Sequence, residues 1–170
     1  MPGTYEPIAT TTLGSNTQGL IFNNIPQTYT DLVLVFKGNI TQAYWDVVMR
    51  FNNNSSNYSN IGFAATNTTM DAAKNSTVTG IQIGMVSGFS ASGLYAIGHT
   101  NIYNYTNTNV NKVVSTTQTF PEYANGMSIG TWADTSAITS IYLYSRGSGS
   151  VVGFDILAGT QITLYGIKAA

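Results

Sequence analysis

Apolar and polar residues alternate along much of this chain with the two-residue period of β-strands. In the segment 161–167, Ile162, Leu164 and Gly166 fall on one face and the residues between them fall on the other. Residues 127–132 alternate in the same manner. Further runs rich in β-branched and aromatic residues predict strands at 19–22, 31–37, 47–51, 81–85, 94–97, 102–105, 113–115 and 138–144. The pattern therefore predicts about ten short strands.

The segment 70–74 is the one stretch that could be helical. It is too short to form a stable helix alone, so we expect a surface turn there. Many short strands with turn signals between them are typical of a sandwich or a barrel. Since each sheet of a sandwich needs cover on only one face, we expect an all-β, antiparallel, jelly-roll-like β-sandwich. Residues 1–170 should form this single domain, with the Gly/Ser-rich stretch 145–150 as a loop.

The composition favours association. Hydrophobic residues make up 43% of the 170 residues, enough for a substantial core, but charged residues make up only 8%, against about 25% in ordinary soluble domains. The formal net charge is −1, so little electrostatic repulsion keeps copies of the chain apart. A surface of Asn, Thr, Ser, Gly and Tyr suits permanent assembly, and a neutral extracellular domain is the alternative.

Nucleic acid and membranes are not expected partners. Phosphate binding needs clustered basic residues, whereas those of this chain are scattered: Lys37, Arg50, Lys74, Lys112, Arg146 and Lys168. No apolar run approaches the roughly 18 residues of a membrane span. The N-terminal segment 1–7 lacks the basic and apolar regions of a signal peptide, so we expect synthesis and assembly in the cytoplasm.

The sequence offers no pattern for catalysis, a cofactor or a metal. A hydrolytic triad needs a base beside its nucleophile, and the only histidine, His99, lies in a strand-like stretch where a structural role is expected. There is no cysteine, and the calcium-loop spacing is absent. A lone calcium held by loop carbonyls would leave no sequence trace. The acidic residues form no closely spaced pair: Glu6, Asp31, Asp46, Asp71, Glu122, Asp134 and Asp155. Asp31 and Asp134 are expected in turns or caps.

The aromatic residues leave one binding hypothesis open. Sandwich folds can bind sugars by stacking them on exposed rings, whose faces match the C–H face of a sugar. The candidates for stacking are Tyr44, Trp45 and Trp132. For Trp132, packing over the open end of the sandwich is the alternative.

Several segments, taken in order, resemble a family of small virion structural proteins of tailed bacteriophages. The matching segments are 5–14, 25–35, 50–53 with 57–59, 104–108 with Lys112, 130–132 with 137–141, and Phe154 with 157–167. The resemblance implies a jelly-roll-like domain in the virion, acting as a capsid decoration (cement) protein or as part of a tail, fibre or baseplate. It implies no catalytic residue. The segment 70–93 departs most from the family pattern.

Within this family, a short chain without a shaft or an attachment region favours a cement protein that bridges capsid subunits. Its expected partners are the major capsid protein and copies of itself, arranged as a trimer. The expected interaction arm is the extended N-terminal segment Met1, Pro2, Gly3, Thr4 and Tyr5, which could add to a neighbour's sheet edge. The alternative is a tail or baseplate component that contacts the host surface and binds glycans. The third hypothesis is a phage-borne glycan hydrolase.

Overall fold

The computed structural model describes residues 5–40, 45–66, 68–86, 95–120, 124–146 and 155–168. These residues contain twelve strands and no helix, hence none long and apolar enough to cross a membrane. The strands are β1 Tyr5–Thr12, β2 Gly19–Phe22, β3 Asp31–Gly38, β4 Trp45–Phe51, β5 Tyr58–Thr66, β6 Met70–Val78, β7 Ile81–Val86, β8 Ala96–Tyr103, β9 Lys112–Phe120, β10 Ala124–Trp132, β11 Ile141–Arg146 and β12 Gln161–Ile167.

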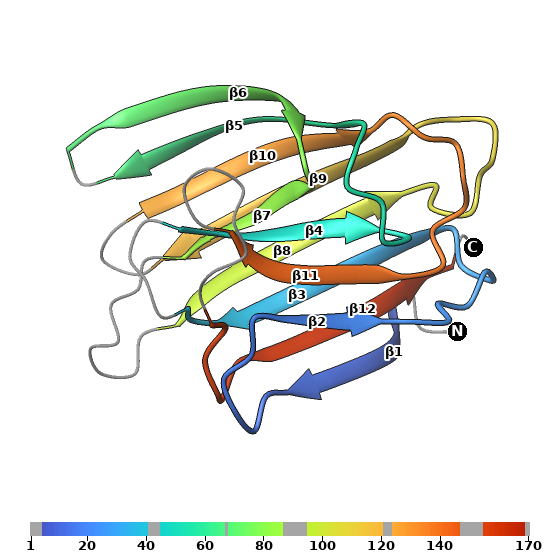
Figure 1. The fold of residues 1–170 in the computed structure, drawn as a ribbon, viewed down its shortest axis with the longest axis horizontal. Coiled ribbons are helices and arrows are strands. Elements are labelled where there is room, and N and C mark those ends of the chain that lie inside the picture. Colours follow the sequence, from blue (N-terminus) through green and yellow to red (C-terminus); the bar gives the residue numbers. More distant parts are fainter. Residues whose placement is uncertain are drawn as a thin grey trace.

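The strands form two antiparallel sheets that pack face to face. The larger has eight strands in the order β1-β12-β3-β8-β9-β10-β5-β6, and the smaller has four in the order β2-β11-β4-β7. Figure 1 shows the smaller sheet lying in front of the larger one. The predicted all-β, antiparallel, jelly-roll-like sandwich is confirmed.

Two local expectations are wrong. The segment 70–74 is neither helix nor turn but the start of β6, because pairing with β5 overrides its local preference. The runs 94–97 and 102–105 belong largely to one strand, β8. The chain continues through Gly98 instead of turning, and a Cβ there would lie 2.9 Å from the Ile83 carbonyl oxygen. Gly98 therefore allows β7 to approach β8 closely.

One strand and one boundary were not predicted. β5 has a weak apolar pattern, as has β1, which only the resemblance of residues 5–14 to a first strand predicts, and β11 begins at Ile141 and continues through Arg146. The expected loop 145–150 therefore starts later than predicted, and its remainder lies outside the described residues.

The core fills the space between the sheets with alternate residues of each strand. In β3, for example, Leu32, Leu34 and Phe36 are buried. An aromatic cluster of Phe51, Tyr58 and Trp132 lies where β4, β5 and β10 meet, with ring centroids 5.5 to 6.3 Å apart. The core also contains Phe22, Ile25, Ile40, Val47, Met49, Ile81, Ile83, Ala96, Ile102, Tyr105, Val114, Ile138, Ile141, Leu143, Ile156, Ile162 and Leu164.

A buried lysine joins two loops at one end of the sandwich. Lys112 is fully buried at the start of β9, and its Nζ donates hydrogen bonds to the carbonyl oxygens of Asn107 (2.6 Å), Val110 (2.9 Å) and Thr135 (3.0 Å). Burial lowers the pKa of the Lys112 ammonium, while the Asp134 carboxylate opposes that shift. This side chain therefore joins the β8–β9 loop to the β10–β11 loop.

Replacing Lys112 should destabilise the whole domain. In Lys112→Met the apolar stem remains but three carbonyls lose their donor, so the free energy of unfolding should fall by about 3 kcal/mol. Urea denaturation followed by tryptophan fluorescence measures this. The exposed Lys37 is the control, because Lys37→Met should change the stability by less than about 0.5 kcal/mol. Equal stabilities of the two variants would contradict the role of Lys112.

Candidate functional site

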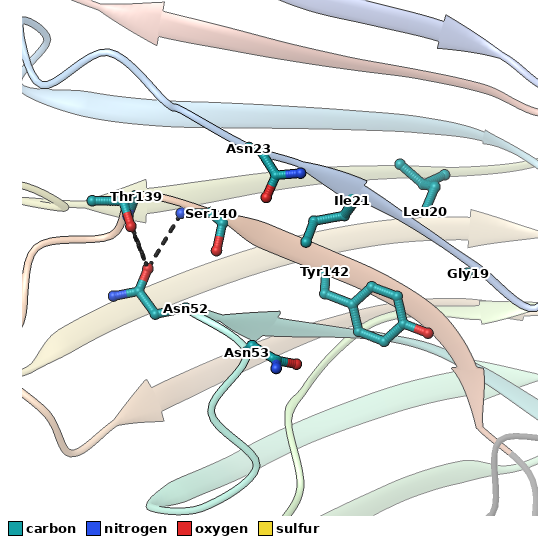
Figure 2. A pocket seen from close by; sticks show the side chains of 9 residues that line it. All are labelled: Gly19, Leu20, Ile21, Asn23, Asn52, Asn53, Thr139, Ser140 and Tyr142. Atoms are coloured by element: carbon teal, nitrogen blue, oxygen red, sulfur yellow. Dashed lines mark hydrogen bonds between the residues drawn. The ribbon is translucent and has the colours of Figure 1, made fainter.

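An open groove of about 470 Å³ lies on the outer face of the four-stranded sheet. Its floor is formed by β2 and β11, and its rim by the turns after β4 and before β11 (Figure 2). Nine residues line it: Gly19, Leu20, Ile21, Asn23, Asn52, Asn53, Thr139, Ser140 and Tyr142. Among the described residues, the lining contains no carboxylate, no histidine and no cationic side chain.

Tyr142 is the aromatic residue of the groove, and the surrounding strands fix its ring. The ring stacks on that of Tyr144 with centroids 5.4 Å apart. Tyr144 in turn lies under the guanidinium of Arg50, 4.4 Å from the ring centroid, and its hydroxyl hydrogen-bonds Thr79. A Cβ at Gly19 would lie 2.6 Å from the Tyr142 hydroxyl, so only glycine leaves room for the ring across β2.

Asn52 holds the rim of the groove together. Its Oδ1 accepts hydrogen bonds from the backbone N–H of Thr139 (2.9 Å) and Ser140 (3.2 Å), and from the Thr139 hydroxyl (3.2 Å). Its Nδ2 donates to the carbonyl oxygen of Ala137 at 2.8 Å. The amide thus ties the turn after β4 to the segment leading into β11, as the dashed lines in Figure 2 show in part.

Four other polar side chains of the lining form no hydrogen bond with the described part of the chain. The side chains of Asn23 and Asn53 and the hydroxyls of Ser140 and Tyr142 have no hydrogen-bond partner in the described part of the structure. Ile21, 49% exposed, pairs with Tyr142 across the β2–β11 ladder. Figure 2 shows these two side chains between Asn23 and Asn53. The groove therefore combines an apolar centre with free, uncharged hydrogen-bonding groups.

A second surface lies on the outer face of the eight-stranded sheet. Phe63 pairs with Met127 and Ile61 with Ile129 across the β5–β10 ladder, and Met70 on β6 lies beside Ala65. We call the five exposed apolar side chains the β5–β10 patch: Ile61, Phe63, Met70, Met127 and Ile129, each 40% to 77% exposed. The three strands are neighbours at one end of the sheet (Figure 1).

The β5–β10 patch is as large as the largest apolar patch of a typical monomer. At roughly 100 Å² for each side chain it exposes roughly 500 Å² of apolar surface, within the range of roughly 300 to 600 Å² for such patches, which are often functional. On its β9 side the next residues in register are Thr117 and Ser115. The patch thus ends at a row of hydroxyl groups on one side and at the edge strand β6 on the other.

Of the three predicted sugar-stacking residues, only Trp132 has a side chain that the structure describes. Trp132 is 1% exposed and packs against Phe51 and Tyr58, so its prediction as a stacking ring is wrong and the packing alternative is confirmed. Tyr44 lies outside the described residues, and Trp45 is placed only as the first residue of β4.

The structure leaves the predicted N-terminal interaction arm untested. Met1, Pro2, Gly3 and Thr4 lie outside the described residues. Tyr5 is the first residue of β1, pairs with Ile167 and makes an edge-to-face contact with Tyr165. Because β1 is an edge strand of the eight-stranded sheet, the contact of residues 1–5 with a neighbour stays a prediction.

The residues considered for catalysis lie apart. His99 lies on the outer face of β8, in register with Val35 and Thr117. Asp31 accepts the backbone N–H of Asn104, and Asp134 accepts that of Ser136, so both cap turns as predicted. No cluster of three potential metal ligands is present in the described residues.

The comparisons with known proteins show neither a family nor a function for this chain. No family model and no curated protein sequence matches the chain. Among solved structures, it resembles a PL-14 alginate lyase from Aplysia kurodai, with 8% identity, a TM-score of 0.35, and coverage of 95% of this chain and 81% of that chain. It also resembles peanut lectin with a 9mer peptide, with 11% identity, a TM-score of 0.37, and coverage of 98% and 92%. Likenesses this weak carry no functional argument.

Replacing each of the two neighbouring asparagines at the rim by glycine should change the free energy of unfolding by very different amounts. Both have a positive φ, 50° at Asn52 and 55° at Asn53, so glycine keeps the backbone conformation. Asn52→Gly removes four hydrogen bonds and should lower the free energy of unfolding by about 2 kcal/mol. Asn53→Gly removes none and should change it by less than about 0.5 kcal/mol. Thermal denaturation of both variants checks this, and equal losses would contradict the anchoring role of Asn52.

Proposed function

We propose that this chain is a structural protein of a bacteriophage particle and serves there as a capsid decoration (cement) protein without enzymatic activity. The observation that carries the proposal is the β5–β10 patch. The patch exposes apolar side chains on a sheet face that the fold does not cover, in a chain with very few charges. Surfaces of this kind mark association sites.

The occupant that we assign to the β5–β10 patch is a second copy of the chain. A standard interface buries about 800 Å² on each partner, and the patch alone supplies more than half of that area in apolar surface. Identical copies carry a net charge of only −1 each, so their mutual repulsion is weak. Because the patch reaches the edge strand β6, copies placed around an axis beside β6, as in a trimer, can bury it.

The resemblance supplies the link to the phage particle. Its segments coincide with β1, β3 and β12, which are neighbours in the eight-stranded sheet, and with the turn that contains Asn52. In this proposal the partners are the major capsid protein and copies of the chain itself, and the location is the virion.

A tail or baseplate location is the second candidate. The open groove on the opposite outer face favours it, because a surface with free hydrogen-bonding groups suits contact with the host cell. The two candidates differ in where the protein sits and in what its removal does.

Particles that lack the protein test the main proposal. A cement protein binds the assembled shell and stabilises it by mass action. Heads without it should still assemble but burst at a lower temperature, and adding the purified protein should restore their resistance. A gold-labelled antibody should mark the head. Heads of unchanged resistance, with loss of adsorption to the host, would replace this proposal with the tail candidate.

A charge placed in the β5–β10 patch should separate the copies. Ile129→Glu puts a carboxylate at the centre of the contact, so the dissociation constant measured by sedimentation should rise at least about tenfold. The control is Gln161→Glu, which adds a charge to an exposed position four strands away on the same face. Circular dichroism should show that both variants remain folded. An oligomer unaffected by Ile129→Glu would rule out the patch as its interface.

A further inference from the structure

We propose that the groove on the four-stranded sheet is a binding site for a neutral, hydroxyl-rich carbohydrate, centred on Tyr142. This inference does not depend on the proposed function, because it concerns the isolated chain and the opposite outer face of the sandwich.

The shape and size of the groove fit an extended sugar chain. Its volume of about 470 Å³ lies within the range of small-molecule sites, and it is open. The groove presents the side chains of Ile21 and Tyr142 from neighbouring strands, together with polar side chains at its rim, so it can recognise a ligand through side chains.

The aromatic ring at the centre is presented in a fixed orientation. One face of Tyr142 is covered by Tyr144, which leaves the opposite face for a ligand in the groove. The Tyr144 ring is itself fixed by the Arg50 guanidinium that lies over it and by the hydrogen bond between its hydroxyl and that of Thr79. Little ordering of the ring is therefore needed on binding, which reduces the entropic cost of association. A sugar's C–H face can stack on this ring and lie against the exposed Ile21.

The free polar side chains of the groove can form hydrogen bonds with the hydroxyl groups of a sugar. The side-chain amides of Asn23 and Asn53 each offer donors and an acceptor side by side, as neighbouring sugar hydroxyls require. The hydroxyls of Ser140 and Tyr142 add groups that can donate or accept. None of these side chains has a partner in the described residues. No described residue of the lining is cationic, and the nearby Arg50 guanidinium is already engaged by the Tyr144 ring and by the Thr79 carbonyl oxygen, so the ligand is assigned as neutral.

The test uses the full chain and measured binding to defined glycans. An array of neutral and acidic oligosaccharides, followed by NMR titration with the neutral oligosaccharide that binds best, should show binding confined to neutral glycans. The shifted amide signals should belong to residues 19–23, 52–53 and 139–142. Tyr142→Ala should weaken binding at least about tenfold, and Asn53→Gly, which keeps the positive φ of that residue, should weaken it less.

Two further variants separate binding from folding. Tyr142→Phe keeps the stacking ring and should bind within about threefold of the unmodified chain. Tyr103→Ala removes an exposed tyrosine from the opposite outer face and should bind unchanged. The proposal is overturned if no neutral glycan binds, if acidic glycans or peptides bind instead, or if Tyr142→Ala binds as well as Tyr142→Phe.

Discussion

The alternation of side chains across a β-strand is the constraint on which this structure depends. Each strand has two faces, and the packing of one sheet on the other uses only the inner face of each. Leu32, Leu34 and Phe36 on β3 and Ile162 and Leu164 on β12 meet that need. The outer faces are not required by the core. Apolar residues placed there, as in the β5–β10 patch, and a groove formed there are therefore available for function.

The segments that carry the family resemblance mainly specify the fold. Asn52, Asn53 and Asn57 adopt positive φ in the turn that crosses from one sheet to the other, and Tyr58 closes that turn by accepting the N–H of Phe51 at 2.8 Å. Burial raises the pKa of the Tyr58 phenol, which stays a neutral hydrogen-bonding group. Lys112 and Trp132 are equally internal. The same segments also contribute Asn52, Asn53, Thr139 and Ser140 to the lining of the groove.

The sequence predicts the strands well where both period and residue type agree, as in β3 and β12. It does not predict β6, whose alanine-rich start becomes a strand only because β5 lies beside it. The residues of β10 alternate between two faces, but the sequence alone does not tell whether the face with Met127 and Ile129 lies toward the core or toward solvent. They face outward because Trp132, in the other set, fills the core. The groove could not be predicted, because β2, β11 and the turn after β4 meet only through strand register.

The central claim is that the outer face of the eight-stranded sheet is an association surface. The most direct measurement is a cryo-electron microscopy reconstruction of the intact particle at a resolution that shows side chains. The account predicts that Ile61, Phe63, Met127 and Ile129 are buried between copies of the chain on the head, with Tyr142 facing solvent. A reconstruction in which these four side chains face solvent, or in which the groove lies against the shell, would contradict it.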